Sequence, residues 1–326
     1  MQRCAQEDER IHSLLLVRSG YIVFEEYYHG WSQNKYHNVN SVTKSVTSAL
    51  VGVALREKLI DTLDRPLLSF FSEYDARNGE ADGVLLRHLL SLTSGLVSPP
   101  GDIDTFLEHT ASLERILSRP AKHEPGQVFA YDDIDIHLVS LVLSRVTGMS
   151  TAAFALAYLF EPLGIWCDEQ GEPYPWQHGK ASEDTPHPWG LQDGQLLWSV
   201  DRQGNTIGAF GLQLTAREMA KFGYLYVKRG IWDGRQIIPA EYVQASIRAY
   251  SSTSKGADYG YCWYILHKRR QNAYLALGFG GQLIVCLPDL DMLFVMTAQP
   301  TIERPPAHSN VLDKGLWPLV EALEAK

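Results

Sequence analysis

A serine followed three residues later by a lysine stands at Ser41–Lys44, where a strongly patterned helix is predicted to begin. The same spacing occurs at Ser32–Lys35 and Ser252–Lys255, but both of these segments are polar and loop-like. Side chains three residues apart share one face of a helix, so Lys44 can reach the Ser41 hydroxyl. The helix N-terminus offers free N–H groups to an oxyanion, and a desolvated lysine whose pKa falls can accept the serine proton. Spacing alone favours a simpler interpretation, in which Ser41 caps the helix and Lys44 is solvated.

The pattern of apolar residues predicts the elements that position this motif. Two β-rich runs, 14–17 and 21–24, flank a turn at 18–20 and predict a hairpin. Helical periodicity starts at Val42 and ends near the polar residues 56–58. The other predicted elements are helices over 84–92 (with Gly95 as a C-cap), 134–146, 215–226 (with Thr215 as N-cap) and about 311–324, and strands over 283–287 and 292–297.

Strands at both ends with helices between them predict one α/β lobe built from both termini and one inserted helical lobe. Within a single domain, we place the α/β lobe at about 1–65 and 215–326, and the helical and loop-rich lobe at about 66–214. The stretch 166–205 is loop-like and rich in Pro and Gly. Its tryptophans either line a substrate cleft or pack the interface between the lobes; they are Trp166, Trp176, Trp189 and Trp198.

The composition is that of an ordinary globular enzyme, with 45% hydrophobic and 21% charged residues in a chain of 326. The net charge of -9 and the lack of a basic run speak against a nucleic-acid partner. Five histidines show no metal-ligand spacing, and we predict surface or packing roles for them: His29, His37, His123, His178 and His187. No apolar run approaches the length of a membrane span. The first ten residues are polar, so we expect no membrane partner and a cytoplasmic location. Four scattered cysteines predict reduced thiols: Cys4, Cys167, Cys262 and Cys286.

Several segments of the chain resemble one known family, in the family's order. Residues 40–50, Asn-Ser-Val-Thr-Lys-Ser-Val-Thr-Ser-Ala-Leu, resemble the serine-motif helix of the β-lactamase-related proteins. That family includes class C β-lactamases, D-amino-acid peptidases, family VIII esterases and nylon-oligomer hydrolases. Residues 86–96 and 211–223 resemble two further family segments, and residues 124–126, Glu-Pro-Gly, lead into Tyr131. The resemblance implies an α+β, penicillin-binding-protein-like fold, in which an antiparallel sheet is flanked by helices and carries an inserted helical lobe.

The second motif of the family, Tyr-x-Asn, reads Tyr131-Asp132-Asp133 here. By resemblance, Tyr131 and Ser41 face the cleft between the lobes, and Tyr131 moves protons between Ser41 and the leaving group. The charge of Lys44 would stabilise the phenolate that this role requires. Asparagine at the last position would donate to a substrate carbonyl, whereas Asp133 can only accept or pair with Lys44. Asp133 is therefore a candidate substrate-binding residue, and it speaks against classical β-lactam binding.

The third motif, Lys-Thr-Gly or His-x-Gly, aligns with Ala276-Leu277-Gly278, and Phe279-Gly280-Gly281-Gln282 follows. The glycines let the strand approach a substrate closely, or they only shape a tight strand entry. The resemblance implies that the backbone N–H groups of Ser41 and Phe279 form the oxyanion hole. Ala276 replaces the cation that would anchor a carboxylate, which speaks against efficient β-lactamase or carboxypeptidase action. The candidate substrate-binding residues of this motif are Gly278, Gly280 and Gln282.

Together these observations predict a serine hydrolase that forms an acyl-enzyme on Ser41, assisted by Lys44 and Tyr131. The expected substrate is a small ester or amide, and the resemblance implies no metal or organic cofactor. One alternative is a β-lactamase or D-amino-acid peptidase of the same fold. Another is a non-catalytic binding protein that keeps the fold. The sequence leaves the physiological substrate and the oligomeric state open.

Overall fold

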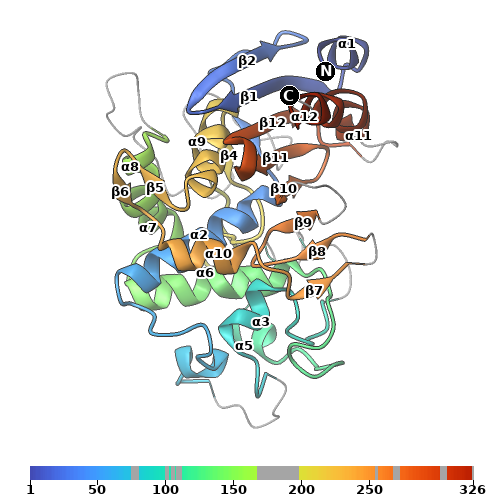
Figure 1. The fold of residues 1–326 in the computed structure, drawn as a ribbon. Coiled ribbons are helices and arrows are strands. Elements are labelled where there is room, and N and C mark those ends of the chain that lie inside the picture. Colours follow the sequence, from blue (N-terminus) through green and yellow to red (C-terminus); the bar gives the residue numbers. More distant parts are fainter. Residues whose placement is uncertain are drawn as a thin grey trace.

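The two ends of the chain pair in one antiparallel sheet, whose strand order is β2-β1-β12-β11-β10-β9-β8-β7 (Figure 1). The computed structural model describes residues 1–74, 81–99, 103, 107, 112–166, 198–253, 256–266, 272–301 and 307–324. The predicted N-terminal hairpin and both predicted C-terminal strands are confirmed. The strands are β1 (Ile11–Arg18), β2 (Tyr21–Tyr27), β7 (Ser251–Ser252), β8 (Asp258–Tyr259), β9 (Tyr264–Leu266), β10 (Ala273–Gly278), β11 (Gln282–Leu287) and β12 (Met292–Ala298).

Helices cover both faces of the central strands (Figure 1). Leu15 and Val17 of β1 belong to the core shared with α2 (Val42–Arg56) and α9 (Ala216–Val227). Leu14 and Leu16 point into a second core. A strand buried on both faces needs apolar residues at successive positions, which is why the sequence of β1 does not alternate. The second core is closed by α1 (Gln2–Glu7), α11 (Ala307–Val311) and α12 (Trp317–Glu324).

The middle of the chain contributes helices that pack around α6 (Asp133–Thr147), which itself lies against α2 and α3. This group brings the N-terminal ends of α2 and α6 together, as the site below requires. The other helices are α3 (Leu86–Leu90), α5 (Leu113–Leu117), α7 (Thr151–Ala155), α8 (Glu161–Leu163) and α10 (Ala240–Ser246). Short strand pairs are β3 (His37–Asn38) with β4 (Gln213–Leu214), and β5 (Ile231–Trp232) with β6 (Arg235–Gln236). Single 3-10 turns occupy Leu67–Phe70 and Pro288–Leu290.

The helix ends follow the capping chemistry of the sequence in α9 but not in α3. Thr215 caps α9 in a reciprocal pair with Glu218, whose carboxylate accepts from the Thr215 N–H at 2.8 Å. The predicted cap of α3 at Gly95 is wrong, because the helix ends at Leu90 and the left-handed turn falls on Leu92, with φ of 54°. The predicted C-terminal helix begins earlier than expected and is interrupted by a π-helical turn at Leu312–Leu316.

Two further expectations from the sequence concern membranes and thiols. Among the described residues no single helix is long and apolar enough to cross a membrane; Asp133–Thr147 and Thr151–Leu163 meet that test only as a pair bent by 74°. Cys4, Cys262 and Cys286 are free thiols, as predicted, and Cys167 lies outside the described residues. Burial raises the pKa of Cys262 to about 12, so this thiol stays protonated at neutral pH.

Candidate active site

Ser41 and Lys44 meet at the start of α2, as their spacing predicts. Lys44 Nζ lies 2.8 Å from Ser41 Oγ and donates to it. Every residue of α2 from Val42 to Ala54 is buried, so the Lys44 side chain runs inside the protein and is only 1% exposed. Ser41 itself stays partly exposed. The alternative of a solvated lysine is therefore wrong.

Three acceptors surround the Lys44 ammonium group. Besides Ser41 Oγ, they are Asp133 Oδ1 at 2.5 Å and the backbone carbonyl oxygen of Ala209 at 3.0 Å. Burial disfavours the charged lysine, but its interactions with Asp133 and Tyr131 outweigh this penalty and hold the pKa of Lys44 above its ordinary value. The expectation of a lysine whose pKa has fallen is wrong, because Asp133 pairs with Lys44, which is one of the two roles that the sequence left open for this carboxylate.

The second motif brings Tyr131 and Asp133 to the same lysine. Asp133 is the first residue of α6, and Asp132 caps this helix by accepting a hydrogen bond from the Ile134 N–H at 2.9 Å. The centre of the Tyr131 ring lies 4.8 Å from Lys44 Nζ, and the tyrosine is 41% exposed. A serine, a lysine, a tyrosine and an aspartate are thus gathered where α2 and α6 begin. We call these four residues the Lys44 centre.

A buried arginine holds the middle residue of the second motif. The Arg119 guanidinium pairs with the Asp132 carboxylate and, at 2.7 Å, with Oδ1 of Asp135. All three side chains are at most 3% exposed. Burial raises the pKa of Asp135 to about 7. Sequence reasoning missed Arg119, because it lies outside every motif and its partners follow more than ten residues later.

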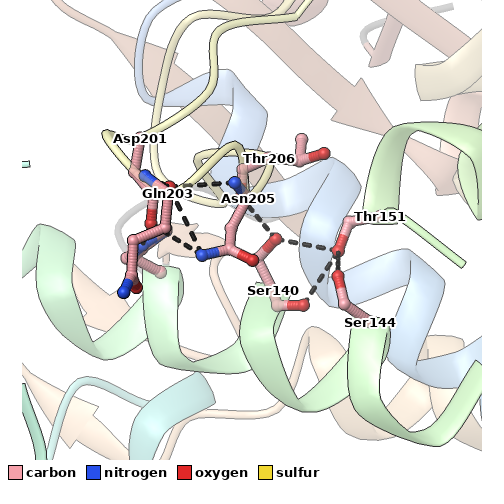
Figure 2. Close-up of polar contacts among 8 residues, drawn as sticks. Ser140, Ser144, Thr151, Asp201, Gln203, Asn205 and Thr206 are labelled. Atoms are coloured by element: carbon pink, nitrogen blue, oxygen red, sulfur yellow. Dashed lines mark hydrogen bonds and ion pairs between the residues drawn. The ribbon is translucent and has the colours of Figure 1, made fainter. Parts of the chain in front are cut away.

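The turn before Ala209 is closed by its own side chains, as Figure 2 shows. The Asp201 carboxylate accepts from the backbone N–H groups of Gln203 at 2.8 Å and Asn205 at 2.9 Å. Its second oxygen lies 3.1 Å from Nε2 of His137, a buried residue of α6. The turn is therefore tied to the helix that carries Asp133.

The segment that follows this turn runs between α2 and α6 and is bonded to both. Ser140 Oγ of α6 donates to the Thr206 carbonyl at 2.7 Å (Figure 2), and Thr47 Oγ1 of α2 donates to the Gly208 carbonyl at 2.7 Å. These two bonds fix the backbone on either side of residue 207. The next carbonyl along the chain, that of Ala209, is the third acceptor of Lys44.

The third motif reaches the same region through its backbone. A side chain on Gly278 would collide with the carbonyl oxygen of Val39, and Gly280 has a φ of 82°, which favours glycine. Between them Phe279 is 52% exposed. Its carbonyl accepts a hydrogen bond from Nδ2 of Asn40 at 3.0 Å. The residue before Ser41 therefore joins the nucleophile segment to the turn 278–282, which we call the glycine turn. Sequence reasoning missed this use of Asn40.

The last residue of the glycine turn is buried in the sheet. Gln282 is 1% exposed, its amide nitrogen donates to the Ala298 carbonyl, and its amide oxygen accepts from the Ala298 N–H at 3.4 Å. Its polar groups are thus used between β11 and β12 rather than offered to a ligand. Ala276 is also 1% exposed and brings no charge.

Two of the four tryptophans are core residues. Trp166 and Trp198 are at most 4% exposed, and their rings meet edge to face with centroids 6.5 Å apart. Each indole N–H is satisfied by a backbone carbonyl, that of Gln213 at 3.0 Å for Trp166 and that of Ile207 at 2.8 Å for Trp198. The packing alternative holds for both; Trp176 and Trp189 lie outside the described residues.

Comparison with known proteins gives the class of this fold and then the family. A protein of Bacillus anthracis, provisionally described as a 6-aminohexanoate-dimer hydrolase, superposes with a TM-score of 0.76 over 98% of this chain and 81% of its own, at 19% identity. EstCE1, a hydrolase with promiscuous acyltransferase activity, superposes with a TM-score of 0.70 over 91% of this chain and 92% of its own, at 17% identity. These likenesses establish the β-lactamase and penicillin-binding-protein-like fold.

Sequence comparison adds a relative and the family itself. An uncharacterised protein of Alkalihalophilus pseudofirmus is 25% identical over 310 residues, which cover 87% of this chain and 82% of that protein. The Beta-lactamase family model matches residues 5–311. The chain therefore belongs to the beta-lactamase family, and two of its structural neighbours are described as hydrolases.

Proposed function

We propose that this protein is a serine hydrolase that transfers the acyl group of a small ester or amide to Ser41 and then to water. The observation that carries the proposal is the 2.8 Å contact of Ser41 Oγ with a fully buried lysine, inside a cluster that also holds Tyr131 and Asp133. A buried lysine bonded to a partly exposed serine is the arrangement that an activated nucleophile needs.

The chemistry follows from the positions of the groups. Ser41 Oγ attacks the carbonyl carbon as its proton leaves towards Lys44, and the carbonyl oxygen becomes an oxyanion. The backbone N–H groups of Ser41 and Phe279 are the candidate donors to that oxygen. Tyr131, exposed beside Lys44, is placed to hand a proton to the leaving group. Water then attacks the acyl-enzyme and releases the acid.

The side chains around the nucleophile favour a neutral acyl group. Ala276 supplies no cation for a substrate carboxylate, and Asp133 is an acceptor already engaged by Lys44. A substrate with a terminal carboxylate, such as a penicillin or a peptide C-terminus, would meet no counter-charge from these positions. The hydrolase neighbours support ester and amide chemistry, while β-lactam or D-amino-acid peptide cleavage stays as the second candidate because the family and fold include it.

A single labelling experiment tests the proposal. The intact protein is treated with a fluorophosphonate and its mass is measured, beside Ser41→Ala and the matched control Ser32→Ala, which removes the serine of an unused Ser-x-x-Lys match. We expect one adduct in the wild type and in Ser32→Ala, and none in Ser41→Ala. Panels of p-nitrophenyl esters, short amides and nitrocefin then rank the substrate classes. A folded wild-type protein without any adduct would instead support the non-catalytic binding protein.

A further inference from the structure

The Lys44 ammonium group has a donor for each of its three acceptors, and the acceptors differ in what they can do with a proton. The Ala209 carbonyl can only accept a hydrogen bond, and Ser41 Oγ carries the proton that must leave during acylation. Asp133 Oδ1, at 2.5 Å, is the only one of the three that can take a proton and become a neutral acid. Among these three acceptors, Asp133 is therefore the outlet for a proton that enters Lys44 from Ser41; Tyr131 also interacts with the ammonium group.

The surroundings of Asp133 keep it available for this exchange. It is the first residue of α6, its side chain is 23% exposed, and Arg119 fixes the preceding residue. The family resemblance places an amide at this position, and an amide has no proton affinity comparable to that of a carboxylate. The exchange of asparagine for aspartate thus changes which group can carry the proton, rather than only which group contacts a substrate.

We propose that Asp133 is the proton acceptor behind Lys44, so that Ser41, Lys44 and Asp133 form a relay that activates the nucleophile. This inference rests on the proposed function, because it describes how the same serine is activated. Asp133 acts through Lys44 and touches no reacting carbon, so it is a positioning residue that sets the protonation state of the lysine.

The relay balances in each half-step. As Ser41 Oγ bonds to the carbonyl carbon, its proton moves to Lys44 Nζ while one Lys44 proton moves to Asp133 Oδ1. The π electrons of the carbonyl become the oxyanion. When the oxyanion collapses, the bond to the leaving oxygen or nitrogen breaks and that atom takes a proton from Lys44, either directly or through Tyr131, which gives up its phenol proton and receives one from Lys44. Asp133 returns its proton to the lysine side, and the ion pair is restored.

Three titratable groups near the lysine and Asp133 stay neutral in the range of the assay. Burial raises the pKa of Tyr259 and Tyr264 well above the ordinary value of a phenol, and that of Cys262 to about 12. The rings of Tyr259 and Tyr264 pack edge to face with centroids 4.9 Å apart. Asp135, two residues beyond Asp133, has its pKa raised to about 7 and titrates within the assay range, but it is present in all three variants, so a difference between their profiles reports on position 133.

The test is the pH dependence of Ser41 labelling by a fluorophosphonate, measured from about pH 5 to about pH 10 for the wild type, Asp133→Asn and Asp133→Glu. The fluoride leaving group needs no proton, so the rate reports activation of the serine alone. The relay predicts a wild-type rate that is flat through the neutral and alkaline range, because the carboxylate is the acceptor. In Asp133→Asn burial is no longer opposed by the carboxylate, so neutral Lys44 becomes the acceptor. The rate should then follow a titration limb that changes about tenfold per pH unit below its midpoint.

The outcomes separate this inference from the proposed function. No labelling of the wild type would remove the proposed function, whereas labelling with identical pH profiles in wild type and Asp133→Asn would remove only the relay. A new limb in Asp133→Asn together with a flat profile in Asp133→Glu supports the relay. If Asp133→Asn is folded by circular dichroism but silent at every pH, Asp133→Glu decides: flat labelling supports the relay, and silence overturns it.

Discussion

The Lys44 centre and the glycine turn are the two halves of the site, and they are built in opposite ways. In the Lys44 centre the lysine is buried and is bonded by Asp133 and by the Ala209 carbonyl, and Arg119 holds the neighbouring Asp132. The glycine turn projects an exposed Phe279 and is joined to the nucleophile segment by the amide of Asn40. The proposed proton transfer thus depends on several bonds to a buried lysine. The proposed oxyanion hole depends on the backbone conformation of the glycine turn and on one side-chain hydrogen bond.

The largest expected effect is on the rate of reaction at Ser41, when the lysine of the Lys44 centre is removed. Lys44→Met keeps the apolar stem but deletes the group that bonds Ser41, so fluorophosphonate labelling and ester turnover should fall by about 10²–10⁴-fold. The measurement is the second-order rate of labelling. Lys35→Met, which alters the lysine of an unused match, is the control and should label like the wild type. Equal rates in both variants would contradict the role of Lys44.

The next effect tests how firmly the second motif is held. Arg119→Leu leaves the buried carboxylates of Asp132 and Asp135 without their cation, which should lower the free energy of unfolding by about 3–5 kcal/mol. The measurement is the free energy of unfolding, obtained from urea unfolding of the variant and the wild type. The control is Arg145→Leu, which breaks the exposed pair with Glu73 and should unfold close to the wild type. A small loss in Arg119→Leu would show that α6 is positioned by packing instead.

A smaller effect is expected when the link between the two halves is cut. Asn40→Gly removes the amide that bonds the Phe279 carbonyl but keeps a backbone that accepts the φ of 49° at this position. Losing one hydrogen bond should reduce the rate of Ser41 labelling by up to about tenfold. Asn40→Ala should show the same kinetic loss plus a drop in thermal stability, since a left-handed alanine is strained. Unchanged labelling in Asn40→Gly would mean that the glycine turn holds its shape alone.

These two halves also differ in how far the sequence reveals them. The spacing of Ser41 and Lys44 and the periodicity of α2 and α6 predict the nucleophile and its helix, because both are local properties. Tyr131 required the family resemblance. The raised pKa of Lys44 depends on its pairing with Asp133, which the sequence offered only as one of two alternatives, because the fold decides where residue 133 lies. The bond from Asn40 to Phe279 joins residues 239 positions apart, and no local pattern encodes such a contact.

A second contact that no local pattern encodes is made by two histidines, one of which lies in the strand that leads to Ser41. Nε2 of His37, in β3, lies 3.2 Å from Nδ1 of His12, in β1. The ring of Trp31 stacks on both, with centroids 3.9 Å from that of His12 and 4.2 Å from that of His37. Burial lowers the pKa of His12 to about 4 and that of His37 to about 3. The sequence predicts surface or packing roles for His37 but gives no sign of this stack.

This stack gives the smallest expected effect, a loss of stability in acid. Below the ordinary pKa of 6.5 the unfolded chain binds protons at both histidines, whereas the folded protein does not until about pH 4. The two buried neutral histidines therefore do not reduce the free energy of unfolding above about pH 6.5. As the pH drops towards 4 they reduce it increasingly, which should lower Tm by a few degrees. Asp135, with its pKa raised to about 7, acts in the opposite direction. The matched variant His12→Phe keeps a ring against Trp31 and leaves Asp135 in place, so the difference between variant and wild type isolates the histidine. Its Tm should decline less between about pH 7 and about pH 5, with Ser41 labelling at neutral pH unchanged; parallel declines would assign the acid sensitivity to other groups.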